Sequence, residues 1–241
     1  MYNTQYVLLS RLFYRGGIAV CGRFAQKSPT KQIAKKFKVE DVPPLAERYN
    51  VAPSQTVLAV REGSGGREAS FLKWGLVPRW AKDAGIGNRL INARSETVTE
   101  KPSFREAFAR RRCLVPADGF FEWSRRGDGK RPFYFQMRDG EPFAIAALWE
   151  RWEGEGGPLE TCTLLTTEAN ELLASYHDRM PVIMRPEDYD LWLSSEERRT
   201  ESLLPLLRPY PREEMTTYAV SLVVNSPSND SPRCIEPARE S

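Results

Sequence analysis

Hydrophobic residues in this chain fall in short, strand-sized runs that are bounded by glycine, proline and charged residues. Within several runs apolar and polar positions alternate, which is typical of β-strands. A glycine-rich turn at 63–66 separates the first two runs, and 125–130 and 154–158 have the composition of hairpin loops. The predicted strands span residues 56–60, 70–74, 113–115, 119–123, 133–137, 143–148, 161–166 and 217–224.

A helical period occurs in fewer places. Phe104 and Phe108 lie four residues apart on one face of a predicted helix, and two other candidates begin with acidic residues, which suit a helix N-terminus. Strands dominate and do not alternate regularly with helices, so we expect an α+β fold and not a doubly wound parallel sheet. The predicted helices span residues 31–37, 103–112, 168–175 and 186–193.

Residues 1–20 differ from the rest of the chain. Their apolar stretch at 6–9 is too short for a signal-peptide core, and the charged residues follow it instead of preceding it. No helical or strand period is sustained there. We expect this segment to be an appendage, or not to be translated at all.

Composition narrows the class of protein. The chain has 241 residues, 41% hydrophobic and 28% charged, as in soluble globular proteins, and no apolar run reaches the roughly 20 residues of a membrane span. The formal net charge is +3, and without Arg11 and Arg15 of the first segment 33 basic side chains face 32 acidic ones. Nucleic-acid affinity would therefore depend on local clusters. One candidate comprises Lys101, Arg105 and 110–112, either a phosphate-binding face or a solvated helix end.

Four cysteines and one histidine limit the possible metal and redox chemistry. Cys21, Cys113, Cys162 and Cys234 form no C-x-x-C pair, which argues against a zinc site. The chain is also larger than typical disulfide scaffolds. We therefore expect reduced thiols, a cytoplasmic protein and no metal site.

Two polar side chains are candidates for proton transfer. His177, the only histidine, has an unshifted pKa of about 6.5 and lies in a polar segment after a predicted helix; the alternative is an exposed or structural histidine. Glu122 lies between Phe121 and Trp123, where desolvation would raise its pKa. Alternatively, Glu122 faces solvent while its aromatic neighbours point inward.

Three other features are ambiguous when taken alone. Asn92 and Arg94 share one face of an extended segment and suit an oxyanion or a phosphate, or they are a turn asparagine and a surface arginine. Cys21 is an internal cysteine with only Arg23 nearby to lower its pKa. Trp74, Trp80 and Trp123 either stack on bases or belong to the core.

Taken together and in order, seven short motifs change this interpretation. They are residues 21–24 (CGRF), 48–53 (RYNVAP), 74–78 (WGLVP), 92–97 (NARSET), 118–123 (DGFFEW), 177–181 (HDRMP) and 224–226 (VNS). This ordered set resembles the SOS response-associated peptidase (SRAP) family of abasic-site processing proteins. The resemblance implies an α+β fold with mostly antiparallel, twisted β-sheets that form a barrel-like core, flanking helices and a DNA-binding groove. The implied domain covers residues 21–237, between an N-terminal extension at 1–20 and a tail at 238–241, with mobility expected from 235 onward.

The resemblance also implies a chemistry. In the family, a cysteine at the mature N-terminus forms a thiazolidine with the aldehyde of a ring-opened abasic site in single-stranded DNA, and Cys21 matches that cysteine. Glu122 matches a proton-transfer residue, His177 a residue that protonates the sugar oxygen and acts in reversal, and Asn92 one that holds the sugar. The resemblance also implies self-cleavage and a weak lyase activity, and it implies that no metal or organic cofactor is needed. The expected protein is a monomer that associates with damaged DNA. The matched DNA-binding residues are Arg23, Arg94, Pro53 and Trp80.

The sequence departs from the family pattern at one position, because Cys21 is not terminal and its nitrogen is an amide. Val20 stands where the family has its initiator methionine, and GTG encodes valine internally but methionine at a start. We therefore hypothesise that translation starts at codon 20. Two other functions stay open: a non-covalent single-stranded DNA-binding protein, and a cysteine peptidase that uses Cys21, His177 and Glu122.

Overall fold

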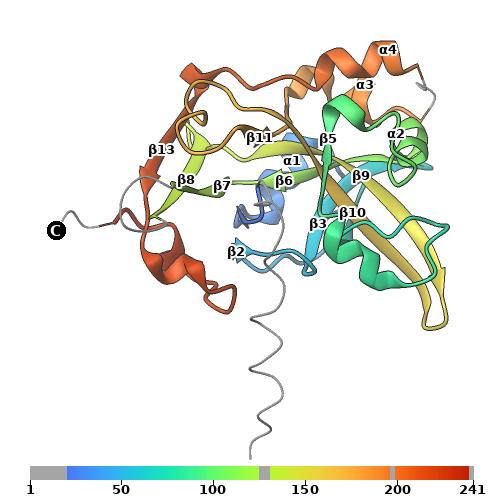
Figure 1. The fold of residues 1–241 in the computed structure, drawn as a ribbon, viewed down its shortest axis with the longest axis horizontal. Coiled ribbons are helices and arrows are strands. Elements are labelled where there is room, and N and C mark those ends of the chain that lie inside the picture. The colour runs from blue at the N-terminus through green and yellow to red at the C-terminus, as the bar shows by residue number, and fades with distance from the viewer. Residues whose placement is uncertain (1–20, 125–130, 196–198, 239–241) are drawn as a thin grey trace, which may run out of the picture.

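A closed five-stranded barrel forms the centre of the protein (Figure 1). The computed structural model describes residues 21–124, 131–195 and 199–238. Neighbouring barrel strands pair in the order β3–β6–β9–β10–β4, and β4 returns to β3. All of these pairs are antiparallel except β10–β4, where Thr161 pairs with Lys73 in parallel. The barrel strands are β3 (Thr56–Gly63), β4 (Gly66–Trp74), β6 (Arg112–Ala117), β9 (Phe143–Gly154) and β10 (Gly157–Glu168).

A second, antiparallel sheet extends to one side of the barrel, at the left of Figure 1. Asp118 lies at the corner where the chain leaves the barrel and enters this sheet. Its carboxylate accepts hydrogen bonds from the backbone of Lys27 and Ser28, which follow β1. The order of strands is β13 (Met215–Ala219), β8 (Arg131–Met137), β7 (Gly119–Ser124), β1 (Phe24–Gln26) and β2 (Arg48–Val51).

Three short strands complete the barrel sheet around the end of β10. β11 (Arg179–Pro181) and β12 (Ile183–Met184) pair with β10 and β9 respectively, where these two strands diverge. β5 (Asn92–Arg94) runs parallel to β10. Thr166 of β10 is thus paired with both Arg94 and Pro181.

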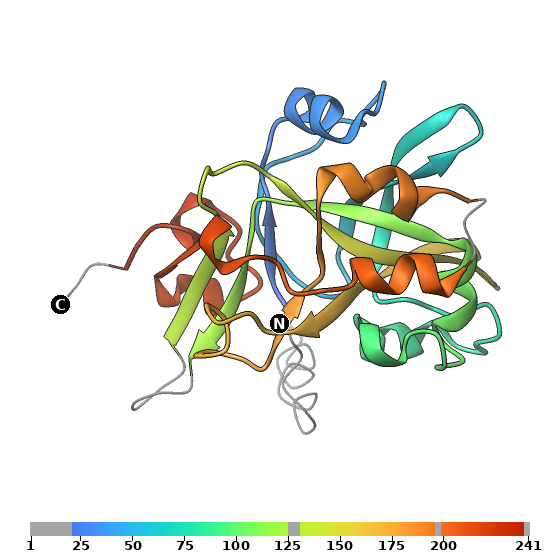
Figure 2. The ribbon, with the colours of Figure 1, turned by 90° about the horizontal axis from the view of Figure 1, so that it is seen from above.

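Short helices surround the two sheets, as Figure 2 shows from above. In α1, Ile33 and Phe37 lie four residues apart and are buried, which explains why this segment forms a helix on the sheet surface. The α-helices are α1 (Thr30–Phe37), α2 (Arg105–Arg110), α3 (Tyr189–Leu193) and α4 (Thr200–Leu203). The 3₁₀ helices are η2 (Ala84–Arg89), η3 (Ser95–Thr97), η4 (Pro186–Asp188), η5 (Leu204–Leu206), η6 (Arg212–Glu214), η7 (Leu222–Asn225) and η8 (Pro232–Cys234).

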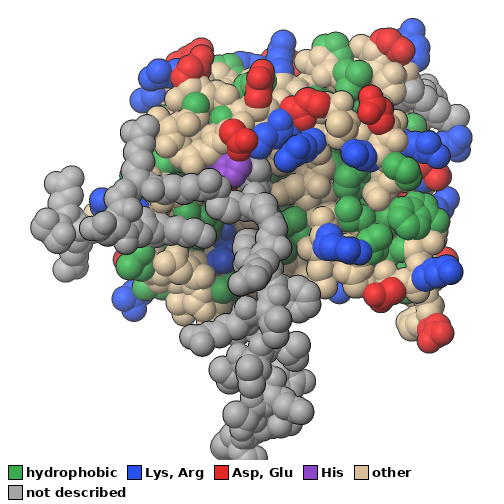
Figure 3. All heavy atoms as spheres, viewed as in Figure 1, with side chains coloured by type: hydrophobic (Ala, Val, Ile, Leu, Met, Phe, Trp, Pro, Cys, Tyr) green, Lys and Arg blue, Asp and Glu red, His purple; other side chains and the backbone are tan. Residues whose placement is uncertain are grey.

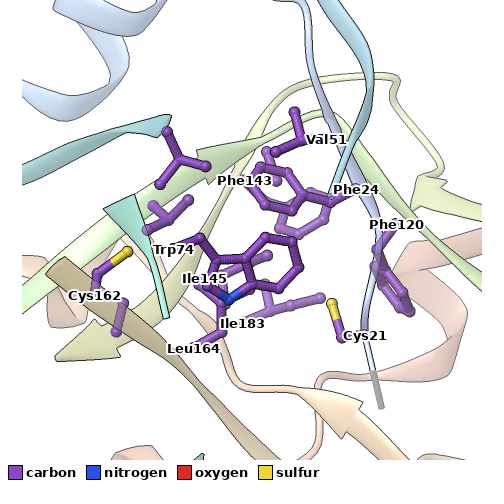
Figure 4. Close-up of a cluster of buried hydrophobic side chains, with 14 of the residues drawn as sticks. Cys21, Phe24, Val51, Trp74, Phe120, Phe143, Ile145, Cys162, Leu164 and Ile183 are labelled. Atoms are coloured by element: carbon purple, nitrogen blue, oxygen red, sulfur yellow. The ribbon is translucent and has the colours of Figure 1, made fainter. Parts of the chain in front are cut away.

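One hydrophobic cluster joins the barrel to the second sheet (Figure 4). Trp74 from β4 packs edge-on against Phe24 from β1, with ring centroids 5.2 Å apart. The indole of Trp74 also donates to the Ile91 carbonyl at 2.8 Å. Cys21 belongs to the same cluster, so the cysteine lies where the two sheets meet.

Most of the predicted architecture is confirmed. The fold is α+β with mainly antiparallel strands and a barrel, and the helix predicted at 31–37 is present. The segment predicted as a helix at 186–193 forms η4 followed by α3. The prediction at 103–112 is too long, because Arg112 already begins β6.

Two predicted elements are wrong. No helix forms at 168–175: β10 continues to Glu168, which pairs with Arg179 of β11, and only a turn follows at 171–176. The strand predicted at 217–224 ends at Ala219, and a 3₁₀ turn follows in which the Ser221 side chain accepts the Val223 N–H.

The last described residues pair with the end of β13 and the residue after it. Val220 pairs with Pro237, and the Ala238 N–H donates to the Ala219 carbonyl at 2.8 Å. Residues 237 and 238 thus contact the second sheet, and the mobility expected from residue 235 onward stays a prediction. The segments 1–20, 125–130 and 239–241, for which we predicted an extension, a loop and a tail, lie outside the described residues. No helix in the described part is both long and apolar enough to cross a bilayer.

Gly75, directly after β4, lies in close contact with the backbone of Gly87. Its φ is +130°, and a β-carbon there would lie 2.7 Å from the Gly87 carbonyl oxygen. We expect Gly75→Ala to lower the free energy of unfolding by about 2 kcal/mol or more, through backbone strain and steric overlap. Urea denaturation measures this loss. Gly65→Ala, at a position with open space around it, is the control and should change stability little; equal stability of both variants would contradict the close approach.

Candidate functional site

A buried carboxylate contacts the backbone nitrogen of Cys21. The Cys21 N–H donates to Glu122 Oε1 at 2.7 Å, and Cys21 and Glu122 are only 0% and 2% exposed. Antiparallel pairing of β1 with β7, in which Phe24 is opposite Phe120, sets this contact. Glu122 is therefore buried, as the interpretation of a desolvated carboxylate expects, and it does not face solvent.

The Cys21 side chain lies in apolar surroundings. Figure 4 shows its sulfur among the side chains of Trp74, Ile183 and Phe120. Burial, together with the negative charge of Glu122, raises the pKa of the Cys21 thiol well above its ordinary value. The thiol is therefore protonated at neutral pH. Cys21 also adopts a positive φ of 47°, a conformation that only a few per cent of non-glycine residues adopt.

Arg23 participates in the architecture of the second sheet. Its NH1 donates to Asn50 Oδ1 at 2.7 Å and to the Val224 carbonyl at 2.9 Å, and its guanidinium lies over the Trp123 ring. Trp123 in turn donates from Nε1 to Asn225 Oδ1 at 2.8 Å. Four of the seven sequence motifs, 21–24, 48–53, 118–123 and 224–226, thus meet in one network of hydrogen bonds. Arg23 binds backbone and side-chain oxygens here, so its predicted contact with a DNA phosphate stays a prediction.

Strand β10 brings two further motifs together. It carries β5, which contains Asn92, on one edge and β11, which begins two residues after His177, on the other. Arg179 joins the two motifs: it donates to both Glu96 oxygens, at 2.5 and 2.9 Å, and to the Thr166 carbonyl at 2.7 Å. The hydrogen bonds from Arg179 lower the pKa of Glu96. We did not predict this clamp from the sequence, although both partners lie within predicted motifs.

His177 and Asn92 are both partly enclosed. The His177 side chain is 9% exposed, with Nδ1 at 2.7 Å from Asp178 Oδ1 and 3.1 Å from the Arg179 backbone nitrogen. Asn92 is half-buried on β5. Ile91, directly before the motif 92–97, and Met180, within the motif 177–181, belong to the same hydrophobic cluster as Cys21. The structure thus packs the segments that contain Asn92 and His177 against the core around Cys21.

The predicted DNA-binding residues lie at or near the surface. Trp80 is 59% exposed, Arg94 is exposed and Pro53 is half-buried after β2. Figure 3 shows Lys and Arg side chains in a row above a hollow with a largely uncharged floor. Such a surface can hold phosphates at its rim and bases in the hollow. Trp74 is fully buried, so it belongs to the core and is not available to stack on a base.

The basic run 110–112 is not a continuous surface. Arg111 and Arg112 are buried, and Arg112 donates to the carbonyls of Phe108, Trp192 and Ser194. Both alternatives for this run, a phosphate-binding face and a solvated helix end, are therefore wrong for these two arginines. Of the run, only Arg110 is exposed.

Cavities and ligand clusters do not suggest a different site. In the part of the chain that the structure describes, no group of three His, Cys, Asp or Glu side chains could hold a metal ion. The larger of two described cavities, about 560 Å³, is lined by residues such as Arg138, Arg185 and Tyr210 and contains none of the predicted site residues.

Comparison with known proteins agrees with the motifs. The family model described as SOS response associated peptidase (SRAP) matches residues 20–227. The abasic site processing protein YoqW of Bacillus subtilis is 44% identical over 222 residues, covering 90% of this chain and 99% of that protein. YedK of Escherichia coli, also named an abasic site processing protein, is 31% identical and covers 90% and 100%.

Solved structures share the fold. A protein from Bacteroides thetaiotaomicron superposes with a TM-score of 0.83 at 28% identity, covering 91% of this chain and all of that one. A protein from Bordetella bronchiseptica has a TM-score of 0.75, also at 28% identity. On the family model and on the relatives that match along nearly their whole length, this chain belongs to the SOS response-associated peptidase family.

Proposed function

We propose that this protein processes abasic sites in single-stranded DNA by linking itself covalently to the lesion through Cys21. The observation that carries the proposal is the 2.7 Å contact between the Cys21 nitrogen and Glu122 Oε1. The relatives named abasic site processing proteins support the substrate. No cofactor is required, because the reaction uses only an amine, a thiol and an aldehyde.

The proposed reaction has two bond-forming steps. The α-amine of a terminal Cys21 adds to C1′ of the ring-opened sugar, and loss of water gives an imine. The Cys21 thiol then adds to the imine carbon while its proton passes to the nitrogen, which closes a five-membered thiazolidine. Only a terminal cysteine places an amine and a thiol on adjacent carbons, so the position of Cys21 matters as much as its identity.

Glu122 is the proposed proton-transfer group. It lies next to the nitrogen that must lose protons before attack and during loss of water, within the distance that general acid–base catalysis requires. The raised pKa of the Cys21 thiol disfavours the thiolate, which supports attack by the amine first and ring closure by the thiol second.

The remaining site residues have supporting roles in this proposal. His177 protonates the sugar oxygen as the ring opens and assists reversal, and Asn92 holds the sugar by hydrogen bonds. Arg23 and Arg94 contact phosphates, while Trp80 and Pro53 line the groove for the strand. We include self-cleavage and a weak lyase activity, which use the same nucleophile and the same acid–base groups, in the proposal.

The chemistry requires that the active form begin at Cys21. We propose that translation starts at codon 20 and that the initiator methionine is then removed. The family model matches from residue 20, and Val20 is compatible with a GTG start. Intact mass of the native protein tests this step directly.

The two competing functions are less well supported. A cysteine peptidase acting on other proteins needs a reactive thiolate, whereas the Cys21 thiol has a raised pKa. A purely non-covalent DNA-binding protein would have no use for a buried carboxylate placed against the Cys21 nitrogen.

The covalent step is tested by a denaturing gel with a single-stranded oligonucleotide whose uracil has been removed by a glycosylase. A form that begins at Cys21 should give an adduct that survives denaturation, and a form that keeps residues 1–20 should not. Cys21→Ala and Cys21→Ser should both abolish the adduct, since neither provides a thiol. Cys162→Ala, which removes another buried cysteine, should keep it; an adduct with Cys21→Ala would overturn the assignment.

Glu122→Gln is expected to have two separable effects. It should slow adduct formation by about 10²-fold, the ordinary contribution of a proton-transfer group. It should also lower the pKa of the Cys21 thiol, because the negative charge that helps to raise it is lost. Alkylation rates against pH, read for each cysteine by mass spectrometry, should therefore rise at lower pH for Cys21. Cys162, whose pKa burial alone raises to about 12, should not respond; an unchanged Cys21 profile would contradict the electrostatic coupling.

Arg94→Ala tests the DNA-binding face. One lost phosphate contact should weaken binding to single-stranded DNA and reduce the slope of log Kd against log salt by about 0.7. Fluorescence anisotropy at several salt concentrations measures both quantities. Arg151→Ala, an exposed arginine that pairs with Glu153, is the control, and equal slopes for the two variants would remove Arg94 from the interface.

A further inference from the structure

A tight turn after β4 presents two neighbouring side chains to solvent. The Ala81 N–H donates to the Pro78 carbonyl at 2.9 Å, so Arg79 and Trp80 occupy the corner of the turn. Their exposed fractions are 57% for the Arg79 side chain and 59% for Trp80. An exposed indole beside an exposed guanidinium can contact a base and a phosphate of the same strand.

Strand β9 holds this turn on both sides of Trp80. Trp152 donates from Nε1 to the Ala81 carbonyl at 2.7 Å. Arg79 Nε lies 3.2 Å from Glu150 Oε1. Because the residues before and after Trp80 are both fixed to the barrel, the position of the indole is set by the fold.

Glu150 is a buried carboxylate with two arginine partners. It is 3% exposed, its Oε2 accepts Arg111 NH2 at 2.7 Å, and its Oε1 also accepts the Arg151 N–H at 3.0 Å. A buried carboxylate is costly unless it is paired, and here one partner is buried while the other extends to the surface. Glu150 thus anchors an exposed guanidinium from below.

We propose that Arg79 binds a backbone phosphate of the DNA strand beside Trp80, and that Glu150 is the positioning residue that aims it. This inference rests on the proposed function. Arg79 Nε lies 3.2 Å from Glu150 Oε1 and NH1 lies 3.9 Å from Glu106 Oε1, so these carboxylates hold the guanidinium at two nitrogens while NH2 takes part in neither contact. A fixed guanidinium next to an aromatic stacking surface is the combination that single-strand binding uses.

The test is equilibrium binding of a labelled, undamaged single-stranded oligonucleotide, followed by fluorescence anisotropy at several salt concentrations. We expect Arg79→Gln to raise Kd about fivefold and to reduce the salt slope by about 0.7, the value for one phosphate contact on a single strand. Arg151→Gln removes the same charge from a side chain that is 51% exposed on the same strand β9 as Glu150, and should change Kd less than twofold. Equal effects of the two variants would overturn the phosphate contact.

The positioning role is tested by a double-mutant cycle. If Glu150 acts through Arg79, Arg79→Gln should change Kd less than twofold in a Glu150→Gln background, whereas additive effects would contradict the role. Glu150 also pairs with buried Arg111, so Glu150→Gln needs a check by urea denaturation. Arg79→Lys gives an independent measurement: lysine keeps the charge and therefore the salt slope, but it lacks Nε, so Kd should rise at least twofold. Wild-type affinity of Arg79→Lys would overturn the positioning role.

The outcomes separate this inference from the proposed function. A wild-type protein that binds the oligonucleotide but forms no adduct contradicts the covalent chemistry, and the Arg79 measurement still stands. A wild-type protein that forms the adduct while Arg79→Gln binds normally overturns the Arg79 contact alone. Absence of any binding by the wild type overturns both.

Discussion

The hydrogen bond between the Cys21 nitrogen and Glu122 is the contact on which the rest of the site depends. A carboxylate that is 2% exposed is unfavourable in an apolar strand unless a donor satisfies it, and the first residue of the domain supplies that donor at 2.7 Å. The pairing of β1 with β7 fixes the two partners relative to one another. Burial also raises the pKa of the Cys21 thiol, and the negative charge of Glu122 adds to that shift.

Strand β10 supplies the second half of the site through its position in the barrel. It closes the ring by a parallel pairing with β4, and beyond that point its edges are free to receive β5 and β11. Asn92 and His177, 85 positions apart in the sequence, are carried to the two sides of one strand, and Arg179 locks the arrangement through Glu96 and Thr166. The barrel is therefore the base to which the short segments around Asn92 and His177 are attached.

The sequence predicts those elements whose signals are local. Long strands with alternating polarity and the helix with Ile33 and Phe37 are recognisable because their own side chains decide their conformation. The strands β1, β2, β5, β11 and β12, which have two to four residues each, exist only because distant strands supply their hydrogen-bond partners, and no local pattern indicates them. The helix expected at 168–175 is similarly absent because pairing with β11 extends β10 as far as Glu168.

The candidate site likewise has features that the sequence indicates and features that depend on residues far apart in the chain. The order of the motifs indicates which residues belong together, yet it does not indicate that Arg179 clamps Glu96 or that Glu150 supports Arg79 from 71 positions away. Arginine illustrates the reason. Arg112, Arg23 and Arg94 look alike in the sequence, but Arg112 is buried against carbonyl groups, Arg23 joins strands and Arg94 is exposed.

A count of basic residues therefore says little about DNA binding in a chain of nearly balanced charge. Arginines that donate hydrogen bonds to buried carbonyl groups stabilise the fold, and their N–H groups are not available to a DNA phosphate. The arginines available to a phosphate are those that the fold holds in place while the guanidinium stays exposed. Arg79, anchored by Glu150 beside an exposed indole, meets that condition, so local geometry, and not net charge, decides which basic side chains of this chain could meet a phosphate.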